Sequence, residues 1–216
     1  MKDILYKEFK LFWNPFVYLL LLFGTFLLIP QWPFFIAFGY IIWIGFVTAF
    51  FIGRSNYDVF FSVSLPVRKK DTVLARVCSV AVLELLQIFV AIPFAILNNV
   101  IYHHSNSAGM NPNFTFFGSI FIMYSIFNII FLPGFYKTAY NVGKPMLLGV
   151  LTSAVFAISV NIAVMLVPVL DTNLNGLGAA NFAYQLPVLL AGIALFVLLT
   201  WLSYKISANR FEKVDL

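Results

Sequence analysis

The chain has 216 residues, of which 62% are hydrophobic and only 10% charged, with a formal net charge of +5. Its mean hydropathy of +0.96 excludes a soluble globular domain, because a protein of this length cannot hide that much apolar surface from water. We interpret the positive charge as a signal of orientation in a membrane, and we expect lipid but no nucleic acid among the partners.

Six apolar stretches divide the sequence, and stretches of about 20 residues can cross hydrocarbon as helices. They are Pro15–Ile29, Phe34–Gly53, Val77–Ile101, Phe114–Leu132, Pro145–Leu170 and Ala183–Tyr204. The pattern predicts an all-α polytopic membrane protein with six transmembrane helices. We expect a single transmembrane domain over residues 1–216, without a folded soluble domain.

The first 14 residues are amphipathic when drawn on a helix. One side carries Leu5, Phe9, Phe12 and Trp13, and the other side carries Asp3, Lys7 and Lys10. This pattern predicts an N-terminal helix that lies in the interface before the chain turns inward near Asn14 and Pro15. The alternative is a frayed beginning of the first span.

All 13 Lys and Arg residues fall in the N-terminal segment, the second and fourth connections, and the tail of residues 205–216. The first, third and fifth connections, Pro30–Pro33, Tyr102–Asn113 and Asp171–Phe182, contain none. Basic residues near span ends stay in the cytoplasm, because the membrane potential and anionic lipid oppose their translocation. We therefore predict a multi-pass protein of the cell membrane with both termini in the cytoplasm.

The longest cytoplasmic connection, residues 54–76, contains a second predicted helix. We expect Asn56 to cap this short helix and Pro66 to end it. Its apolar residues are Tyr57, Val59, Phe60, Phe61 and Val63. Such side chains need a surface to cover them, which is the membrane, the protein's own helices or a second protein.

The third span carries a stripe of polar and small residues, in which Glu84 is the only acid well inside a span. The stripe consists of Glu84, Gln87, Ala91, Ala95 and Asn98. An ionisable group in hydrocarbon is costly, so Glu84 is expected to face protein or water, or to extend toward the cytoplasmic interface near Arg76. A structural role is one interpretation; a gate or substrate path with Gln87 and Asn98, or proton coupling, are the others.

Small residues recur at every fourth position in the second and fifth spans. They are Gly45, Ala49 and Gly53 in one, and Gly149, Ser153, Ala157 and Asn161 in the other. Small side chains allow helix backbones to approach closely. This spacing predicts helix packing, either within the chain or at a dimer face.

Catalytic and metal-binding patterns are weak. Gly143 and Lys144 are followed by Pro145 where a phosphate-binding loop needs Ser or Thr, so we expect ATP to be bound elsewhere. No arrangement of residues predicts a catalytic site. The adjacent His103 and His104 would need a further ligand to hold a metal, and we expect no metal or cofactor on this chain.

Two segments resemble the ABC-2-type permease family, the membrane subunits of ATP-driven exporters. The first is Ser64-Leu65-Pro66-Val67, then Arg68-Lys69-Lys70-Asp71 and Val73-Leu74-Ala75-Arg76; the second is Leu5 to Phe9 ahead of Asn14-Pro15. The family commonly has a small hydroxyl residue and then arginine after the valine, and this chain has Arg68 and Lys69 there. The resemblance therefore covers the fold, but it does not carry over the contact that the family's basic residue makes at this position.

The resemblance implies a subunit that pairs with a second copy or a homologous permease and docks on a cytoplasmic ATPase, which holds ATP and Mg. It implies that Asn56–Ser64 includes the coupling helix and that the N-terminal helix is an elbow along the membrane. The residues expected at the ATPase contact are Asn56, Tyr57, Asp58, Phe60, Phe61, Ser64, Leu65, Pro66 and Arg68.

These patterns predict the permease half of an ATP-driven exporter. Spans rich in Phe and poor in charge suit an amphipathic or hydrophobic cargo, such as a toxin-like or antimicrobial peptide, a drug or a lipid. The alternatives are an immunity or assembly subunit that moves nothing, and, less favoured, an ion-coupled secondary transporter.

Overall fold

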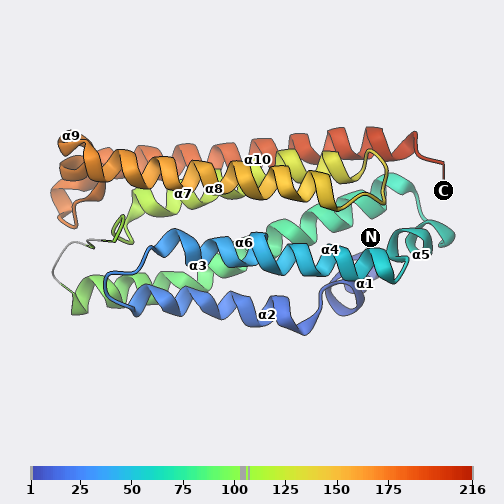
Figure 1. Ribbon diagram of the computed structural model, residues 1–216, viewed down its shortest axis with the longest axis horizontal. Coiled ribbons are helices and arrows are strands. Elements are labelled where there is room, and N and C mark those ends of the chain that lie inside the picture. Colours follow the sequence, from blue (N-terminus) through green and yellow to red (C-terminus); the bar gives the residue numbers. More distant parts are fainter. Residues whose placement is uncertain (1, 103–105, 107, 216) are drawn as a thin grey trace.

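The computed structural model describes residues 2–102, 106 and 108–215. These residues form a bundle of helices and contain no strand (Figure 1). The elements of the first half are α1 (Lys2–Lys7), η1 (Glu8–Phe12), α2 (Pro15–Leu21), η2 (Leu22–Leu28), α3 (Phe34–Tyr40), η3 (Ile41–Gly45), α4 (Phe46–Ser55), α5 (Asp58–Ser64) and α6 (Lys69–Ile101). Those of the second half are α7 (Phe114–Phe135), α8 (Gly143–Leu166), α9 (Pro168–Leu170), η4 (Asp171–Asn175), η5 (Ala179–Asn181) and α10 (Phe182–Glu212).

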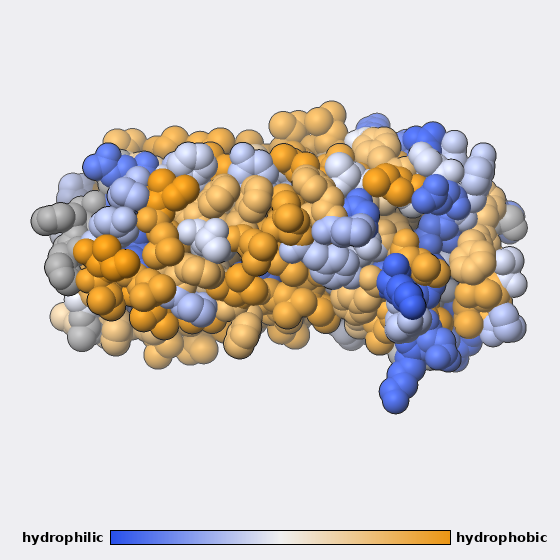
Figure 2. Space-filling view, turned by 90° about the horizontal axis from the view of Figure 1, so that it is seen from below, coloured by the Kyte–Doolittle hydropathy of each residue, from blue (hydrophilic) through white to orange (hydrophobic). Residues whose placement is uncertain are grey.

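Five of the described helical stretches are long and apolar enough to cross a membrane. A sixth is added when the bent pair Lys2–Phe12 and Pro15–Leu28 is counted as one span. Apolar side chains cover most of the face shown in Figure 2, and hydrophilic side chains gather mainly at its right-hand end. The predicted all-α polytopic membrane fold is confirmed.

Both termini and α5 lie at the same end of the bundle, at the right of Figure 1, which we call the terminal end. Helices α7, α8 and α10 run side by side in one half of the bundle. Helix α6 crosses obliquely between this half and the N-terminal helices, and it contacts both η2 and α10. At about 1.5 Å per residue, its 33 residues extend roughly 50 Å, so α6 connects the terminal end with the far end.

A bend of 90° separates the N-terminal helix from the first span. Asn14 is extended and its side chain accepts a hydrogen bond from the Val17 amide at 3.1 Å, while Pro15 occupies the first helical position. This is the usual chemistry of a helix start. The predicted polar side of the N-terminal helix is wrong for Lys7, which is buried with 7% exposure because other segments cover it.

The predicted end of the fifth span is also wrong. The fifth span was expected to reach Leu170, but α8 ends at Leu166 and Val167 is extended. The cause is Pro168, which has no amide hydrogen and disfavours a helical residue before it. Helix α10 continues beyond the sixth predicted span to Glu212, so most of residues 205–216 are helical, while the predicted cytoplasmic location of this tail stays a prediction.

The core centres on α7. In its most apolar part 78% of the residues are buried, compared with 22% in the corresponding parts of α8 and α10. Close helix contacts depend on glycine at Gly118 in α7 and Gly192 in α10. A Cβ atom added at Gly192 would lie 2.8 Å from the Gly118 Cα, so the two backbones touch where these helices cross. The exposed apolar faces of α8 and α10 are left for lipid or for another chain.

Candidate functional site

Helix α5 projects from the terminal end with an aromatic face that the described part of the chain leaves largely exposed. Tyr57, Phe60 and Phe61 are 66%, 42% and 51% exposed. The Tyr57 and Phe60 rings meet edge to face at 6.0 Å. The opposite side of α5 faces the bundle through Ser62, which is buried.

The turn before α5 has an unusual backbone. The predicted cap at Asn56 is wrong, because the Asn56 amide donates to Ile52 O at 2.9 Å and so ends α4. Tyr57 precedes α5 with a φ of 53°, in the left-handed region that bulky residues rarely adopt. The turn therefore holds a large aromatic ring outward at some cost in backbone energy.

Beneath the aromatic face lie four charged side chains, Lys7, Glu8, Asp58 and Arg76, which we call the ion cluster. The Arg76 guanidinium pairs with both Glu8 and Asp58, and its Nη2 lies 3.2 Å from Glu8 Oε1. The Lys7 Nζ lies 2.6 Å from Asp58 Oδ1 and 3.2 Å from Glu8 Oε1. Two cations thus face two carboxylates, so the formal charges cancel.

The ion cluster is almost completely buried. Glu8 is 0% and Arg76 2% exposed, and the guanidinium carbon of Arg76 lies 3.3 Å from the centre of the Phe12 ring. Burial acts to raise the pKa of the Asp58 carboxyl, but Arg76 and Lys7 outweigh it, so this pKa is lowered. Buried charges persist when each has a close partner of opposite sign.

The ion cluster joins three segments that are distant in the sequence. Lys7 belongs to α1 and Glu8 to η1, Asp58 begins α5, and Arg76 lies in the second turn of α6. Lys7 also donates to the Ser62 hydroxyl at 2.7 Å, which adds a second contact to α5. Helix α5 is therefore attached to both the N-terminal helix and α6, and it cannot shift without disturbing them.

The remaining residues predicted at the ATPase contact are Ser64, at the end of α5, and Leu65, Pro66 and Arg68, which follow it. Ser64, Pro66 and Arg68 are exposed and Leu65 is partly buried. Arg68 pairs with Asp71 at 2.9 Å on the surface. The sequence-based set omitted Lys7, Glu8 and Arg76; the available signal was a charged pair inside an amphipathic helix and an arginine at the start of an apolar span.

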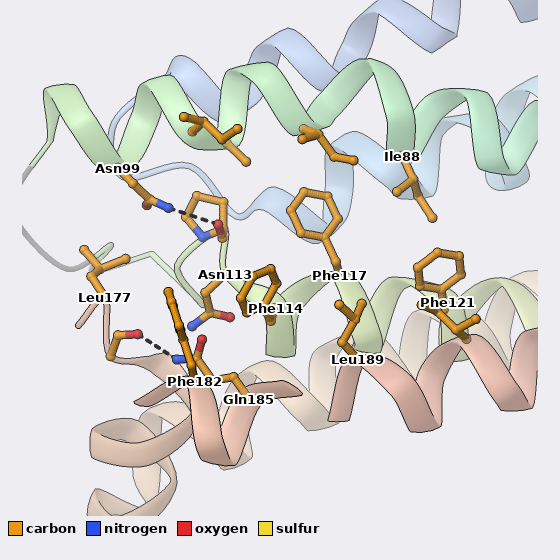
Figure 3. A pocket seen from close by; sticks show the side chains of 16 residues that line it. Ile88, Asn99, Asn113, Phe114, Phe117, Phe121, Leu177, Phe182, Gln185 and Leu189 are labelled. Carbon is orange, nitrogen blue, oxygen red and sulfur yellow. Dashed lines mark hydrogen bonds between the residues drawn. The ribbon is translucent and has the colours of Figure 1, made fainter. Parts of the chain in front are cut away.

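A cavity of about 510 Å³ lies between α6 on one side and α7 and α10 on the other (Figure 3). Its walls are mostly apolar and aromatic, and include Ile88, Phe117, Phe121 and Leu189. Polar groups are confined to one end, where Gln185 Nε2 donates to Gly176 O at 2.7 Å and Asn99 Nδ2 donates to Pro112 O at 3.3 Å. Such a lining suits a ligand that is largely hydrophobic.

A family model described as ABC-2 family transporter protein matches residues 3–212, almost the whole chain. The chain belongs to this family. It is therefore a multi-pass membrane protein and the permease-type subunit of an ABC transporter. No curated protein and no solved structure matches the chain.

The polar stripe of the third span is buried inside the permease. Gln87 donates to Ala37 O at 3.0 Å, and Asn98 donates to Leu27 O at 2.6 Å, so both bind backbone carbonyls of the first two spans. Glu84 is 0% exposed and does not extend to the interface. Neither Glu84, Gln87 nor Asn98 lines the cavity in Figure 3.

The small residues at four-residue spacing contact other parts of the same chain. A Cβ added at Gly53 or Gly149 would meet Phe12 or Phe127, and Gly45 faces Leu20. The Ser153 hydroxyl accepts a hydrogen bond from Trp43 Nε1 at 2.9 Å. Ala49 and Ala157 are buried. Of the two interpretations, these contacts favour packing within the chain.

The predicted histidine pair, His103 and His104, lies outside the described residues. Among the residues that are described, no group of three His, Cys, Asp or Glu side chains could hold a metal ion.

Proposed function

We propose that this permease is half of an ATP-driven exporter and that α5 is its coupling helix, docked on a cytoplasmic ATPase that binds ATP and Mg. The observation that carries the proposal is the exposed aromatic face of Tyr57, Phe60 and Phe61 at a polar end of the molecule. Exposed aromatic clusters rimmed by polar residues are typical of protein interfaces, and they often supply most of the binding energy.

The ion cluster supplies the mechanical link in this proposal. When the ATPase closes, it pushes on α5, and the pairing of Asp58 with Arg76 transmits the displacement to α6. Lys7 transmits it to the N-terminal helix. Because α6 is one continuous helix of 33 residues, a shift at the terminal end also moves the wall of the cavity. Such coupling requires two arrangements of α6 that the partner biases differently.

The cargo in this proposal is amphipathic or hydrophobic, with a toxin-like or antimicrobial peptide first and a drug or lipid next. The largely apolar and aromatic cavity lining supports this class over sugars or ions. The complete transporter contains a second copy of the permease or a homologous one. The exposed apolar faces of α8 and α10 offer the surface for that contact.

The docking proposal is tested by replacing Phe60 and Phe61 with alanine and measuring copurification of the ATPase. Burying a whole Phe side chain contributes about 1.5–3 kcal/mol. Phe60 and Phe61 are 42% and 51% exposed, so docking can bury about half of each. Losing both should therefore weaken association by about 1.5–3 kcal/mol, which is roughly 10- to 100-fold. Phe89→Ala is the matched control, because Phe89 is 72% exposed but lies far along α6 in its apolar part. Tight association of the double variant with the ATPase would refute the assignment of α5.

The cargo proposal has a separate test in the reconstituted complex. Amphipathic peptides should stimulate ATP hydrolysis, whereas polar metabolites should not. Stimulation by polar metabolites alone would contradict the proposed cargo class and leave the docking result unaffected.

A further inference from the structure

Glu84 and Asn128 form an isolated polar pair deep in the apolar core. Glu84 lies in α6 and Asn128 in α7, and both are 0% exposed. Asn128 Nδ2 donates to Glu84 Oε2 at 2.8 Å and lies 3.5 Å from the Thr200 hydroxyl of α10. The Ser203 hydroxyl of α10 donates to the backbone carbonyl oxygen of Asn128 at 2.8 Å, so the pair lies where three helices meet.

One side-chain oxygen of each residue in this pair has no hydrogen bond to any described residue. Glu84 Oε1 and Asn128 Oδ1 are both buried, and neither has a hydrogen-bond partner in the described part of the chain. Buried oxygen acceptors are nearly always satisfied in protein interiors, by a proton donor of the protein, a water molecule or a ligand. Two such atoms on two side chains already joined by a hydrogen bond indicate a single cause.

The surrounding groups do not provide a cation. No Lys, Arg or His forms an ion pair with Glu84 among residues 2–102, 106 and 108–215. From α7, the Tyr124 hydroxyl donates to Gln87 Oε1 at 2.5 Å and is already engaged. From α10 the neighbours are hydroxyl groups. In the second span, the only titratable residue from Phe34 to Gly53 is Tyr40, which packs edge-on against Phe23.

We propose that Glu84 is a proton-binding site: its carboxyl carries a proton on Oε1 and donates it to Asn128 Oδ1. A carboxylic acid and a primary amide each offer one donor and one acceptor side by side, so they can pair head to tail. The amide already donates to Oε2, and the acid returns the second bond. One proton thereby satisfies both leftover oxygens and removes an unpaired charge from a membrane interior.

The proton has a mechanical consequence. The double hydrogen bond joins α6 to α7, and Ser203 extends the connection to α10. If α6 moves as the proposed function requires and water reaches the contact between Glu84 and Asn128, Glu84 ionises and releases its proton to that water. Raising the pH therefore favours the hydrated arrangement. This last link rests on the proposed function, whereas the protonation itself does not.

Infrared spectroscopy of the purified permease in lipid nanodiscs tests the protonation without any ATPase. The sequence contains three glutamates, Glu8, Glu84 and Glu212, so ¹³C-glutamate labelling gives an assignable spectrum. We expect a protonated carboxyl band at pH 7 that Glu84→Gln abolishes. Glu212→Gln is the control: Glu212 pairs with Lys70 at 3.1 Å on the surface, and its loss should leave the band unchanged.

A second variant keeps the test decisive if Glu84→Gln folds poorly. In Asn128→Leu the acid loses its acceptor, so the band should persist but shift to higher frequency. Absence of the band at pH 7 in the wild-type protein would overturn the proposal. So would a band that survives Glu84→Gln. Neither outcome depends on whether α5 binds an ATPase.

Discussion

Replacing Arg76 with methionine should destabilise the permease strongly, because it removes one of the two cations in a buried cluster. Methionine retains an unbranched apolar stem against Phe12, so the change is mainly one of charge. Afterwards Lys7 alone faces Glu8 and Asp58, which are 0% and 12% exposed at the side chain. Removing one partner of a buried ion pair costs about 3–5 kcal/mol, and we expect a loss of that size.

A second substitution should recover much of this loss. Combining Arg76→Met with Glu8→Gln removes one cation and one anion, and leaves Lys7 paired with Asp58 at 2.6 Å. Replacing a whole ion pair by neutral groups is often close to neutral in free energy. We therefore expect the double variant to be more stable than the sum of the single effects predicts, by about 2–3 kcal/mol.

The assay is chemical unfolding of the purified permease at fixed detergent concentration, followed by tryptophan fluorescence. Arg68→Met is the matched control, since the Arg68 side chain is 83% exposed and pairs with Asp71 on the surface. Water and salt screen an exposed pair so that it contributes little to stability, and this variant should unfold almost like the wild type. The reasoning fails if Arg76→Met costs no more than Arg68→Met, or if the losses from Arg76→Met and Glu8→Gln simply add.

Two further predictions concern the same end of the molecule. Tyr57→Gly should relieve a left-handed backbone worth about 1–2 kcal/mol, raising the melting temperature while weakening ATPase copurification. A lower melting temperature with unchanged copurification would contradict both roles of Tyr57. Because the pKa of Asp58 is lowered in the folded state, its contribution to stability is complete at pH values above the ordinary pKa of an Asp carboxyl, about 3.9. The contribution disappears as the pH falls through the lowered pKa of the folded state. The unfolding free energy should therefore lose this contribution only below about pH 4. Unfolding curves of the wild type and of Asp58→Asn, recorded from about pH 3 to about pH 8, check this expectation. A loss of stability that depends on Asp58 and begins near about pH 6 would refute it.

The sequence by itself determined the class of fold and most of the spans. An apolar run in hydrocarbon must satisfy its backbone polar groups internally, and a helix is the only single segment that does so. The runs Phe34–Gly53 and Phe114–Leu132 therefore correspond closely to the observed stretches Phe34–Ser55 and Phe114–Phe135. The resemblance around Ser64-Leu65-Pro66-Val67 also indicated the family whose model matches residues 3–212.

Only the tertiary structure decided where the charges and the closest helix contacts lie. Periodicity placed Lys7 on the outer face of the N-terminal helix, because a helical pattern describes one helix and not its neighbours. In the fold, Asp58 and Arg76 reach Lys7 and Glu8 from distant segments, and mutual pairing stabilises charges that would otherwise seek water. The contact between Gly118 and Gly192 depends likewise on how α7 and α10 cross, since each glycine alone carries no information about its partner.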